Sequence, residues 1–347
     1  MSEPITIGLL AASRIATQAV VRPAADVDGV EVTAVAARSA DRAAEAARTW
    51  ELDQSFGSYQ ELIDSDVDAI YVGTPAALHR RWAIATLQAG KHVLCEKPLA
   101  ANAIDGAAIA EAAAAAATAG VVAMEAFHWR YHPYADQIRS VIESGELGPI
   151  QRVETRFDIE DGHIGRNDIR WDLSIGGGAL MDLGCYNVQW LRFVGEIMGQ
   201  GEPAVVSASA DCPVAGVDGQ LEAELAWPSG ATGYLHTSMM ADFTGRDDVL
   251  NGHVAYLKVS GDRGTMTAVN PLLPQNGASL EVVSSEGRRV EDVASTSTYQ
   301  YQLEAFRDAI NHGQSFPTTI ADGVKNMAVI DACYQAAGLE PRPIVPD

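Results

Sequence analysis

The stretch IGLLAASRIA, residues 7–16, decides how the first part of the chain folds. Its apolar start predicts a buried strand, and the residues from Ser13 onward predict a helix that follows a tight turn. A strand, a turn and a helix in this order are the context of the dinucleotide-binding fingerprint G-x-G-x-x-G/A. The three glycine positions of that fingerprint hold Ala11, Ser13 and Ala16, so the usual glycines are missing.

Small side chains at these positions keep a nucleotide site feasible. Ala11 and Ser13 add little bulk where the turn is tight and the backbone must approach a pyrophosphate, and alanine is accepted at the third position. The N-terminus of the helix retains N–H groups and the positive end of its dipole, which bind phosphate. The stretch alone leaves two interpretations open: a strand–helix turn without a ligand, or a phosphate loop formed by Ala11, Ser13, Arg14 and Ile15.

The alternation of strand and helix signals continues to about residue 125. Short apolar strands separated by helices predict βαβ units and a parallel sheet. We therefore expect an α/β fold whose residues 1–125 form a Rossmann domain with a doubly wound parallel sheet. The expected strands are 4–10, 30–38, 66–75, 91–98 and 121–127, and the expected helices are 13–26, 39–52, 76–90 and 104–120.

A different rhythm follows and predicts a second domain over residues 126–347. Helix signals at 132–148 and 177–199 flank a strand at 150–161, and further strands run from 204 to about 293. They include a hairpin that turns at Pro228, Ser229 and Gly230. This order predicts an α+β domain with a large, mostly antiparallel open sheet. Whether the C-terminal helices, 301–313 and 321–337, pack back on the Rossmann domain stays open.

Composition and charge narrow the classes of partner. A net charge of −22 repels nucleic acid and anionic membrane surfaces, although it also serves as a solubility coat. The four cysteines stand far apart, which predicts reduced thiols and neither a disulfide framework nor a metal site. The N-terminus lacks a basic region followed by an apolar run, and no apolar stretch approaches ~18 residues. We expect a cytoplasmic protein that binds neither nucleic acid nor a membrane.

The end of the second expected strand indicates which cofactor is preferred. An NAD site carries Asp or Glu about 20 residues after the fingerprint, where it binds a ribose hydroxyl. Here Ala37 lies near that place, and Arg38, Ser39 and Arg42 follow it. A guanidinium and a hydroxyl suit a 2′-phosphate, so we expect NADP(H) to be preferred over NAD(H). The alternative is that Arg38 is an ordinary solvated residue.

Three longer stretches carry a family resemblance over nearly the whole chain. YVGTPAALHRRWAIATLQAGKHVLCEKPLA at 71–100, MEAFHWRYHP at 124–133 and GGGALMDLGCY at 176–186 resemble the GFO/IDH/MocA oxidoreductases. The similar branch contains dimeric dihydrodiol dehydrogenase, D-xylose dehydrogenase, glucose–fructose oxidoreductase and sugar 3-ketoreductases. The resemblance implies an NAD(P)-dependent enzyme for sugars, cyclitols or related secondary alcohols. It also implies a homodimer or homotetramer formed through the C-terminal sheet. The loop without glycines departs from the family pattern.

The resemblance makes Lys97, in Glu-Lys-Pro, the catalytic lysine. Its place agrees, because Lys97 follows a parallel strand at the edge where such sheets bind ligands. Pro98 restricts the Lys97 backbone to extended conformations and so helps to aim the side chain. The alternative is a surface ion pair at a strand end. The same stretches assign Thr74, Pro75, His79, Glu96 and Lys97 to the cofactor site.

The second catalytic position implied by the resemblance is the Tyr of Asp-Leu-Gly-Cys-Tyr. Asp182 and Tyr186 are four residues apart and therefore share one face of a helix. A tyrosine near a lysine cation has its pKa lowered toward a useful range, and Asp182 can accept a hydrogen bond from a substrate hydroxyl. The alternative is that Tyr186 only packs in the core. The three glycines at 176–178 let the helix begin close to another backbone or a ligand.

Further polar residues complete the expected substrate pocket. In similar proteins, an Arg–aromatic pair before the glycines lies near substrate and nicotinamide. We expect hydride transfer between NADP(H) and a secondary alcohol or ketone of a sugar-like small molecule. The alternatives are a trans-dihydrodiol dehydrogenase acting on apolar diols and a non-catalytic cofactor-sensing regulator. The expected substrate contacts are His128, Arg130, Arg170, Trp171, Asp182 and Tyr186, with His163 open between pocket and surface.

Overall fold

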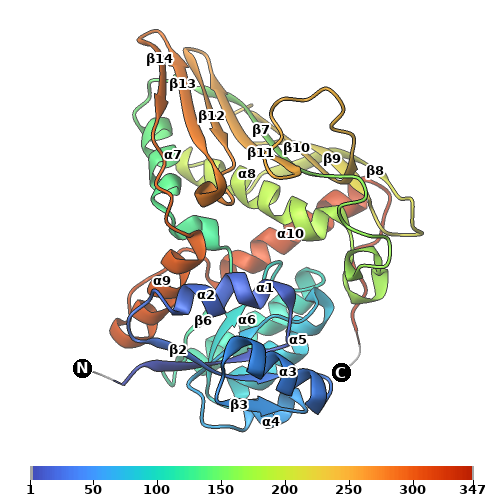
Figure 1. Ribbon diagram of the computed structural model, residues 1–347. Coiled ribbons are helices and arrows are strands. Elements are labelled where there is room, and N and C mark those ends of the chain that lie inside the picture. The colour runs from blue at the N-terminus through green and yellow to red at the C-terminus, as the bar shows by residue number, and fades with distance from the viewer. Residues whose placement is uncertain (1–2, 346–347) are drawn as a thin grey trace. The chain divides into compact units, whose positions relative to one another are not determined.

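The computed structural model describes residues 3–345, and the chain divides into two compact units (Figure 1). Of the described residues, the first unit comprises 3–131, 299–324 and 344–345. The second unit comprises residues 132–298 and 325–343. The division falls six residues after the expected boundary at 125, because a short helical turn follows the last strand of the first unit.

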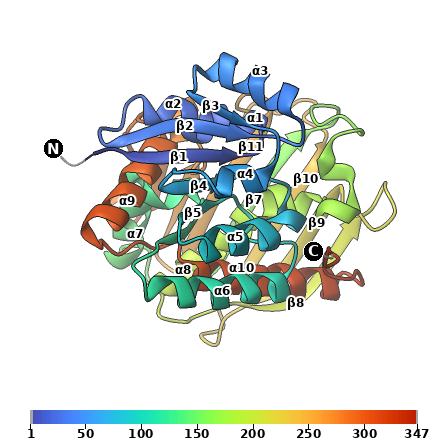
Figure 2. The ribbon, with the colours of Figure 1, turned by 90° about the horizontal axis from the view of Figure 1, so that it is seen from below.

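A six-stranded parallel sheet forms the centre of the first unit, as Figure 2 shows from below. The strand order β3-β2-β1-β4-β5-β6 reverses direction between β1 and β4, which confirms the doubly wound Rossmann arrangement. Ligands of such sheets bind outside the carboxyl ends of the strands at this switch point. The strands are β1 Ile5–Leu10, β2 Val30–Ala36, β3 Gln54–Phe56, β4 Ala69–Val72, β5 His92–Cys95 and β6 Ala123–Glu125.

The helices of the first unit start where the sequence supplies caps. Ser39 accepts a hydrogen bond from the backbone of Arg42 at the start of α3, and Asn102 does the same for Asp105 at the start of α6. The first helix is continuous but contains one π turn, η1. The elements are α1 Arg14–Ala16, η1 Thr17–Val21, α2 Arg22–Ala24, α3 Ala40–Trp50, α4 Tyr59–Ile63, η2 Ala76–Leu78, α5 His79–Gln88, α6 Ala103–Ala117 and η3 His128–Tyr131.

Two C-terminal helices also contribute to the first unit. Helix α9, Thr298–His312, lies in it from Tyr299 onward, and α10, Ile320–Ala336, contributes its residues up to Val324. Between these helices, Thr318 pairs with the edge of β6: its backbone oxygen accepts from Glu125 N at 2.9 Å, and its hydroxyl donates to Glu125 O at 2.6 Å. The chain thus returns to the Rossmann sheet after the whole second sheet has been formed.

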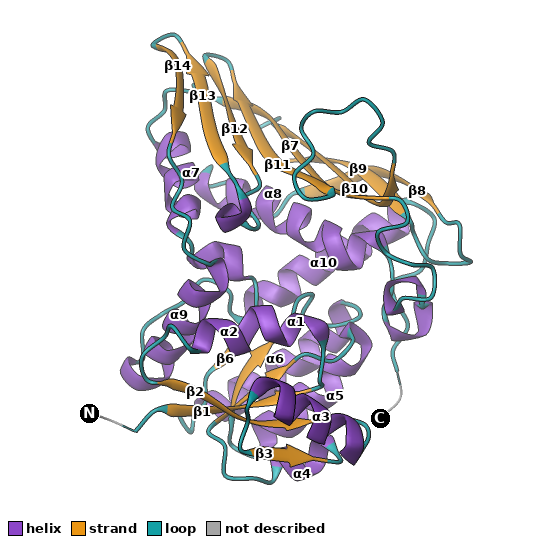
Figure 3. Ribbon diagram, in the orientation of Figure 1, coloured by secondary structure: helices purple, strands orange, loops and turns teal. Residues whose placement is uncertain are grey.

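An eight-stranded sheet forms the second unit, drawn in orange in Figure 3. Its order is β14-β13-β12-β11-β7-β10-β9-β8, and every neighbouring pair is antiparallel except β10 with β7. The expected hairpin is confirmed, since β9 and β10 pair on either side of residues 228–230. The strands are β7 Ile150–Glu160, β8 Ala204–Asp211, β9 Gln220–Ala226, β10 Thr232–Ala241, β11 His253–Gly261, β12 Gly264–Val269, β13 Ser279–Ser284 and β14 Gly287–Glu291.

Alternation along the central strands separates the two faces of this sheet. Val153, Phe157 and Leu235 are buried on the face that packs against helix α8. The opposite face carries charged side chains such as Arg152 and Glu224, whose closest N and O atoms are 3.1 Å apart. The helical elements are α7 Pro133–Glu143, η4 Ile169–Trp171, η5 Leu173–Ile175, η6 Leu180–Gly184, α8 Cys185–Ile197 and η7 Pro274–Asn276. Over residues 3–345, none of the helices is both long and apolar enough to span a bilayer.

Candidate active site

The turn after β1 keeps the backbone of the dinucleotide fingerprint without its glycines. Ala11 has φ +94°, in the left-handed region that normally favours glycine. Its N–H donates to the carbonyl of Ala36 at 3.2 Å, which holds the turn against β2. Ser13 is the N-cap of α1 with an extended backbone. The missing first glycine is therefore replaced by an alanine held in a strained conformation.

Buried polar atoms of Ser13, Thr74 and Gln302, all in the first unit, have no hydrogen-bond partner among the described residues. Ser13 Oγ and Thr74 Oγ1 follow β1 and β4, the two strands at the switch point. Gln302, on α9, is fully buried, and both atoms of its amide have no partner. A buried polar group without a partner costs roughly 1–3 kcal/mol, so these groups fit a site whose ligand supplies hydrogen bonds. Gln302 was missed because one glutamine on an amphipathic helix gives no signal.

Arg38, Ser39 and Arg42 lie at the carboxyl end of β2. Arg38 and Ser39 are exposed, and Ser39 caps α3. Arg42 Nη2 donates to the carbonyl of Ala12 at 3.3 Å, which ties α3 to the turn after β1. Burial raises the pKa of Tyr59, and the charges of Arg38 and Arg42 lower it, so both guanidinium groups lie near this ring. The structure therefore brings Arg42, one of the residues expected to bind a 2′-phosphate, into contact with the turn after β1.

Lys97 follows β5 at the same edge of the sheet, and its peptide bond to Pro98 is cis. The buried Glu96 beside it accepts from Tyr71 Oη at 2.7 Å and from the Lys97 N–H at 3.2 Å. Burial, followed by the positive charge of Lys97, lowers the pKa of His128 to about 3. His128 is thus a neutral ring near the lysine, and it stacks on Tyr299 of α9 with 4.0 Å between ring centroids.

His79 connects the two loops that carry Thr74 and Lys97. Its ring is buried, with Nδ1 3.0 Å from the carbonyl of Pro98 and Nε2 2.7 Å from the carbonyl of Thr74. Burial lowers its pKa despite these carbonyls. Pro75 sits at the start of the short turn that leads to the histidine. The His79 ring therefore lies between the two loops, within hydrogen-bond distance of a carbonyl from each.

Asp182 and Tyr186 lie at the start of the long helix of the second unit. The sequence predicted one helix from residue 177, but the structure begins at Leu180 with a π turn that contains Asp182. π turns are frequent at functional sites. Tyr186, in the first turn of α8, is nearly buried and packs edge-on against Phe157 with centroids 6.0 Å apart. Tyr186 is therefore part of the core, and it follows Asp182 by four residues in the chain.

Arg170 holds the Asp182 carboxylate. Arg170 Nε donates to Asp182 Oδ2 at 2.5 Å, and Nη1 donates to Asp168 Oδ1 at 3.1 Å. Asp182 first, and Asp168 in addition, raise the pKa of Arg170, so the guanidinium stays charged. Sequence reasoning assigned no site role to Asp168, although it lies two residues before Arg170 and caps the same short turn. A half-exposed cation between two carboxylates suits hydrogen bonding to a polyol.

The remaining expected residues differ in exposure. Trp171 is buried and donates from its indole N–H to the carbonyl of Ile164 at 3.3 Å, so it packs the loop. His163 is exposed. Its ring lies against Gly252, where an added Cβ would be 3.2 Å from the nearest ring atom. Arg130 is half-buried with its guanidinium 5.5 Å from the ring centroid of Trp129. Within residues 3–345, no group of three His, Cys, Asp or Glu side chains is arranged to hold a metal ion.

The first unit has a doubly wound sheet with unpartnered polar atoms at its switch point, and the second has a helical segment that carries Asp182 and Tyr186. Together these features are typical of a two-domain dinucleotide-dependent oxidoreductase. Residues 5–127 match the description "Oxidoreductase family, NAD-binding Rossmann fold", and residues 135–267 match "GFO/IDH/MocA C-terminal domain". The chain belongs to the GFO/IDH/MocA oxidoreductase family, which confirms the resemblance drawn from the sequence.

Relatives extend the comparison over nearly the whole chain. A D-xylose 1-dehydrogenase (NADP(+)) of Haloferax volcanii is 33% identical, covering 95% of this chain and 96% of its own. A trans-1,2-dihydrobenzene-1,2-diol dehydrogenase of Xenopus tropicalis is 29% identical, covering 96% and 98%. The crystal structure of KijD10, a 3-ketoreductase of Actinomadura kijaniata in complex with NADP and TDP-benzene, has a TM-score of 0.83 and 25% identity, covering 96% and 98%.

Proposed function

We propose that this protein is an NADP(H)-dependent dehydrogenase or ketoreductase that acts on a secondary alcohol or ketone of a sugar-like molecule. The observation that carries the substrate class is the Arg170–Asp182 pair, whose charged groups can bind several hydroxyls and whose Asp182 lies four residues before Tyr186 in the chain. The xylose dehydrogenase and the 3-ketoreductase among the relatives support this choice.

The residues of the first unit fit such a cofactor. Ser13 and the N–H groups at the start of α1 would bind the pyrophosphate, and Thr74 would donate to the nicotinamide half. The Gln302 amide offers one donor side and one acceptor atom, which complement the carboxamide of nicotinamide. When bound, the nicotinamide supplies or accepts the hydride. The residues that would bind the 2′-phosphate are Arg38, Ser39 and Arg42.

Proton transfer would be the task of Tyr186. In the oxidising direction, the substrate hydroxyl gives its proton to the Tyr186 oxygen as the hydride leaves carbon, and in reduction the proton returns. A nearby cation favours the ionised form of a phenol and stabilises a developing alkoxide, the role that we propose for Lys97. Asp182, paired with Arg170, would accept a hydrogen bond from a neighbouring hydroxyl.

A second candidate is a dehydrogenase for apolar dihydrodiols. The aromatic packing of Tyr186 against Phe157 and Trp190, with centroids 6.0 and 6.4 Å apart, favours it, as does the relative from Xenopus tropicalis. A panel of sugars and aromatic dihydrodiols assayed with NADP⁺ and NAD⁺ separates the two candidates. We expect turnover with sugars, and exclusive turnover of apolar diols would reverse the ranking. A protein that binds NADP but turns over neither class would be the regulatory alternative.

The catalytic lysine is tested by Lys97→Met. We expect turnover to fall by at least ~10²–10³ because the variant loses a cation at the developing alkoxide. The dissociation constant of NADP, measured by fluorescence titration, should change little. Near-normal turnover in the variant would contradict the assignment.

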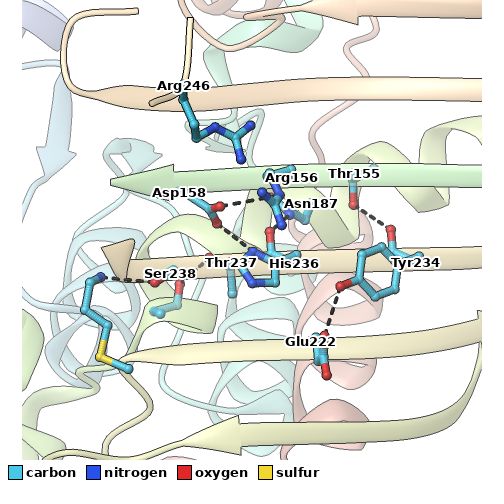
Figure 4. A network of polar contacts seen from close by, with 12 residues as sticks. Thr155, Arg156, Asp158, Asn187, Glu222, Tyr234, His236, Thr237, Ser238 and Arg246 are labelled. Carbon is cyan, nitrogen blue, oxygen red and sulfur yellow. Dashed lines mark hydrogen bonds and ion pairs between the residues drawn. The ribbon is translucent and has the colours of Figure 1, made fainter. Parts of the chain in front are cut away.

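The charged face of the second sheet is proposed to bind a second copy of the chain. Figure 4 shows paired side chains on this face, with His236 Nδ1 2.8 Å from Asp158 Oδ1 and Tyr234 donating to Glu222 at 2.9 Å. A face with both signs of charge can be complementary to its own copy across a two-fold axis. Light scattering should give the mass of a dimer or tetramer, and a monomer would refute this.

The four cysteines are free thiols, which supports the cytoplasmic location that we propose.

A further inference from the structure

A buried cluster of charge lies behind the three glycines of the second unit. The side chains of Asp218 and Arg342 are fully buried and form an ion pair through Asp218 Oδ1 and Arg342 Nη2. Tyr334 Oη donates to the same carboxylate at 3.0 Å, and the guanidinium stacks 3.9 Å from the centre of the Tyr334 ring. The three residues come from a loop, from α10 and from the chain after it, far apart in the sequence.

The cluster is hydrogen-bonded to the turn of residues 176–179, which precedes the helical segment that carries Asp182 and Tyr186. Arg342 Nε donates to the carbonyl of Gly177 at 2.7 Å. Asp218 Oδ2 accepts from the N–H of Leu180 at 2.7 Å, and the Asp218 carbonyl accepts from the N–H of Ala179 at 2.8 Å. Both sides of the turn are therefore bonded to one ion pair, two residues before Asp182.

The glycines are required by this arrangement. Gly178 has φ +140°, and a Cβ there would collide with Asp218 Oδ1 and Arg342 Nη2. A Cβ on Gly177 would lie 2.7 Å from the carbonyl oxygens of Arg170 and Asp172. The turn thus lies in contact with the ion pair on one side and with the Arg170 loop on the other. The sequence suggested that the glycines allow close approach of either another backbone or a ligand, and the structure shows close approach of another backbone.

Two backbone hydrogen bonds link Gly178 to Arg170 and Asp182, the two charged residues of the candidate substrate site. The N–H of Gly178 donates to the carbonyl of Arg170 at 2.9 Å, and the N–H of Asp182 donates to the carbonyl of Gly178 at 3.1 Å. The side chains of Arg170 and Asp182 then bond to each other. A displacement of Gly178 would therefore move both members of that pair.

A fully buried ion pair is poor evidence for stability, because desolvation of the two charges offsets their attraction. We propose that Asp218 and Arg342, with Tyr334, are positioning residues that set the orientation of Arg170 and Asp182 toward the substrate. They touch neither substrate nor cofactor in this proposal, which rests on the proposed function through the role of Asp182. The expected consequence is control over how well the enzyme distinguishes a sugar from its deoxy analogue.

The test replaces the pair by apolar residues, Asp218→Leu with Arg342→Met, and separately makes the mild change Tyr334→Phe. The control is Glu202→Gln, which breaks the pair between Glu202 and Arg192 in α8, with N and O 2.5 Å apart in the same unit. We expect the kcat/KM for a sugar to fall up to about 100-fold in the double variant, as for a small misplacement of catalytic groups. Discrimination against the deoxy sugar should shrink with it, while the Kd of NADP stays constant. Tyr334→Phe should lower kcat/KM and the discrimination against the deoxy sugar by a smaller factor, and Glu202→Gln should leave these two quantities unchanged.

Hydrogen exchange of residues 176–184 gives a readout that needs no turnover. It should accelerate in the double variant and in Tyr334→Phe but not in Glu202→Gln. Unchanged kcat/KM, discrimination and exchange in the folded Tyr334→Phe and double variants would overturn the proposal, and loss of folding in the double variant leaves Tyr334→Phe to decide it. If no sugar is turned over by the unmodified protein, the proposed function fails, and the exchange data alone decide whether the cluster fixes the turn.

Discussion

The strain at Ala11 leads to a quantitative prediction. An L-residue in the left-handed region costs roughly 1–2 kcal/mol, and Ala11 stands there with φ +94°. Ala11→Gly removes this strain but adds the conformational entropy of glycine to the unfolded chain, roughly 0.5–1 kcal/mol. The variant should therefore gain up to about 1.5 kcal/mol in the free energy of unfolding.

Ala12→Gly supplies the matched control for this measurement. Ala12 is the next residue of the same turn and is not among the described residues with positive φ, so its replacement carries the entropy cost without relief of strain. The two variants should differ by roughly 1–2 kcal/mol, because the entropy terms cancel. Urea unfolding of both variants measures the difference directly. If Ala11→Gly destabilises the protein as much as Ala12→Gly does, the turn is not strained and our reasoning is wrong.

Three further variants test the cofactor and substrate groups. Arg38→Ala should remove a preference for NADP over NAD of about 10–150-fold, the value of one charge-assisted hydrogen bond, in calorimetric titrations; equal affinities in the unmodified protein would refute this. Gln302→Leu should weaken NADP binding about 5–10-fold but leave 2′-phospho-ADP-ribose, which has no nicotinamide, unaffected; equal losses for both ligands would contradict a carboxamide contact. Arg170→Ala should raise KM or lower kcat for sugars, and steady-state rates that match the unmodified enzyme would exclude it from the pocket.

Local patterns were sufficient for most of the fold. Buried apolar strands followed by capped helices predicted the parallel sheet, because each element carries its own periodicity and start signal. Strand β3, Gln54–Phe56, and helix α4, Tyr59–Ile63, were not expected. Both are short, and β3 is mostly exposed, so neither produces a run of apolar residues. The π turn at Leu180–Gly184 was also beyond prediction, since only the surrounding contacts select it over an α turn.

The candidate site was predictable only where its chemistry lies within one stretch of chain. Lys97 in Glu-Lys-Pro and Asp182 with Tyr186 belong to compact motifs. Gln302 and Arg342 have no such local signal: the Gln302 amide has no partner among the described residues, and the carboxylate paired with Arg342 lies 124 residues away at Asp218. Both side chains are buried, and the residues around a polar residue on a helix or near a chain end do not reveal that it is buried.

The return of the chain to the Rossmann sheet has a consequence for synthesis on the ribosome. Residues up to 131 emerge first, but Tyr299, which stacks on His128, and Thr318, which pairs with the edge of β6, emerge last. The nascent first unit therefore presents an uncovered edge at β6 throughout translation of the eight-stranded sheet. The first unit with its β6 edge paired can therefore form only after residue 318 has left the ribosome, so its completion belongs to the end of translation.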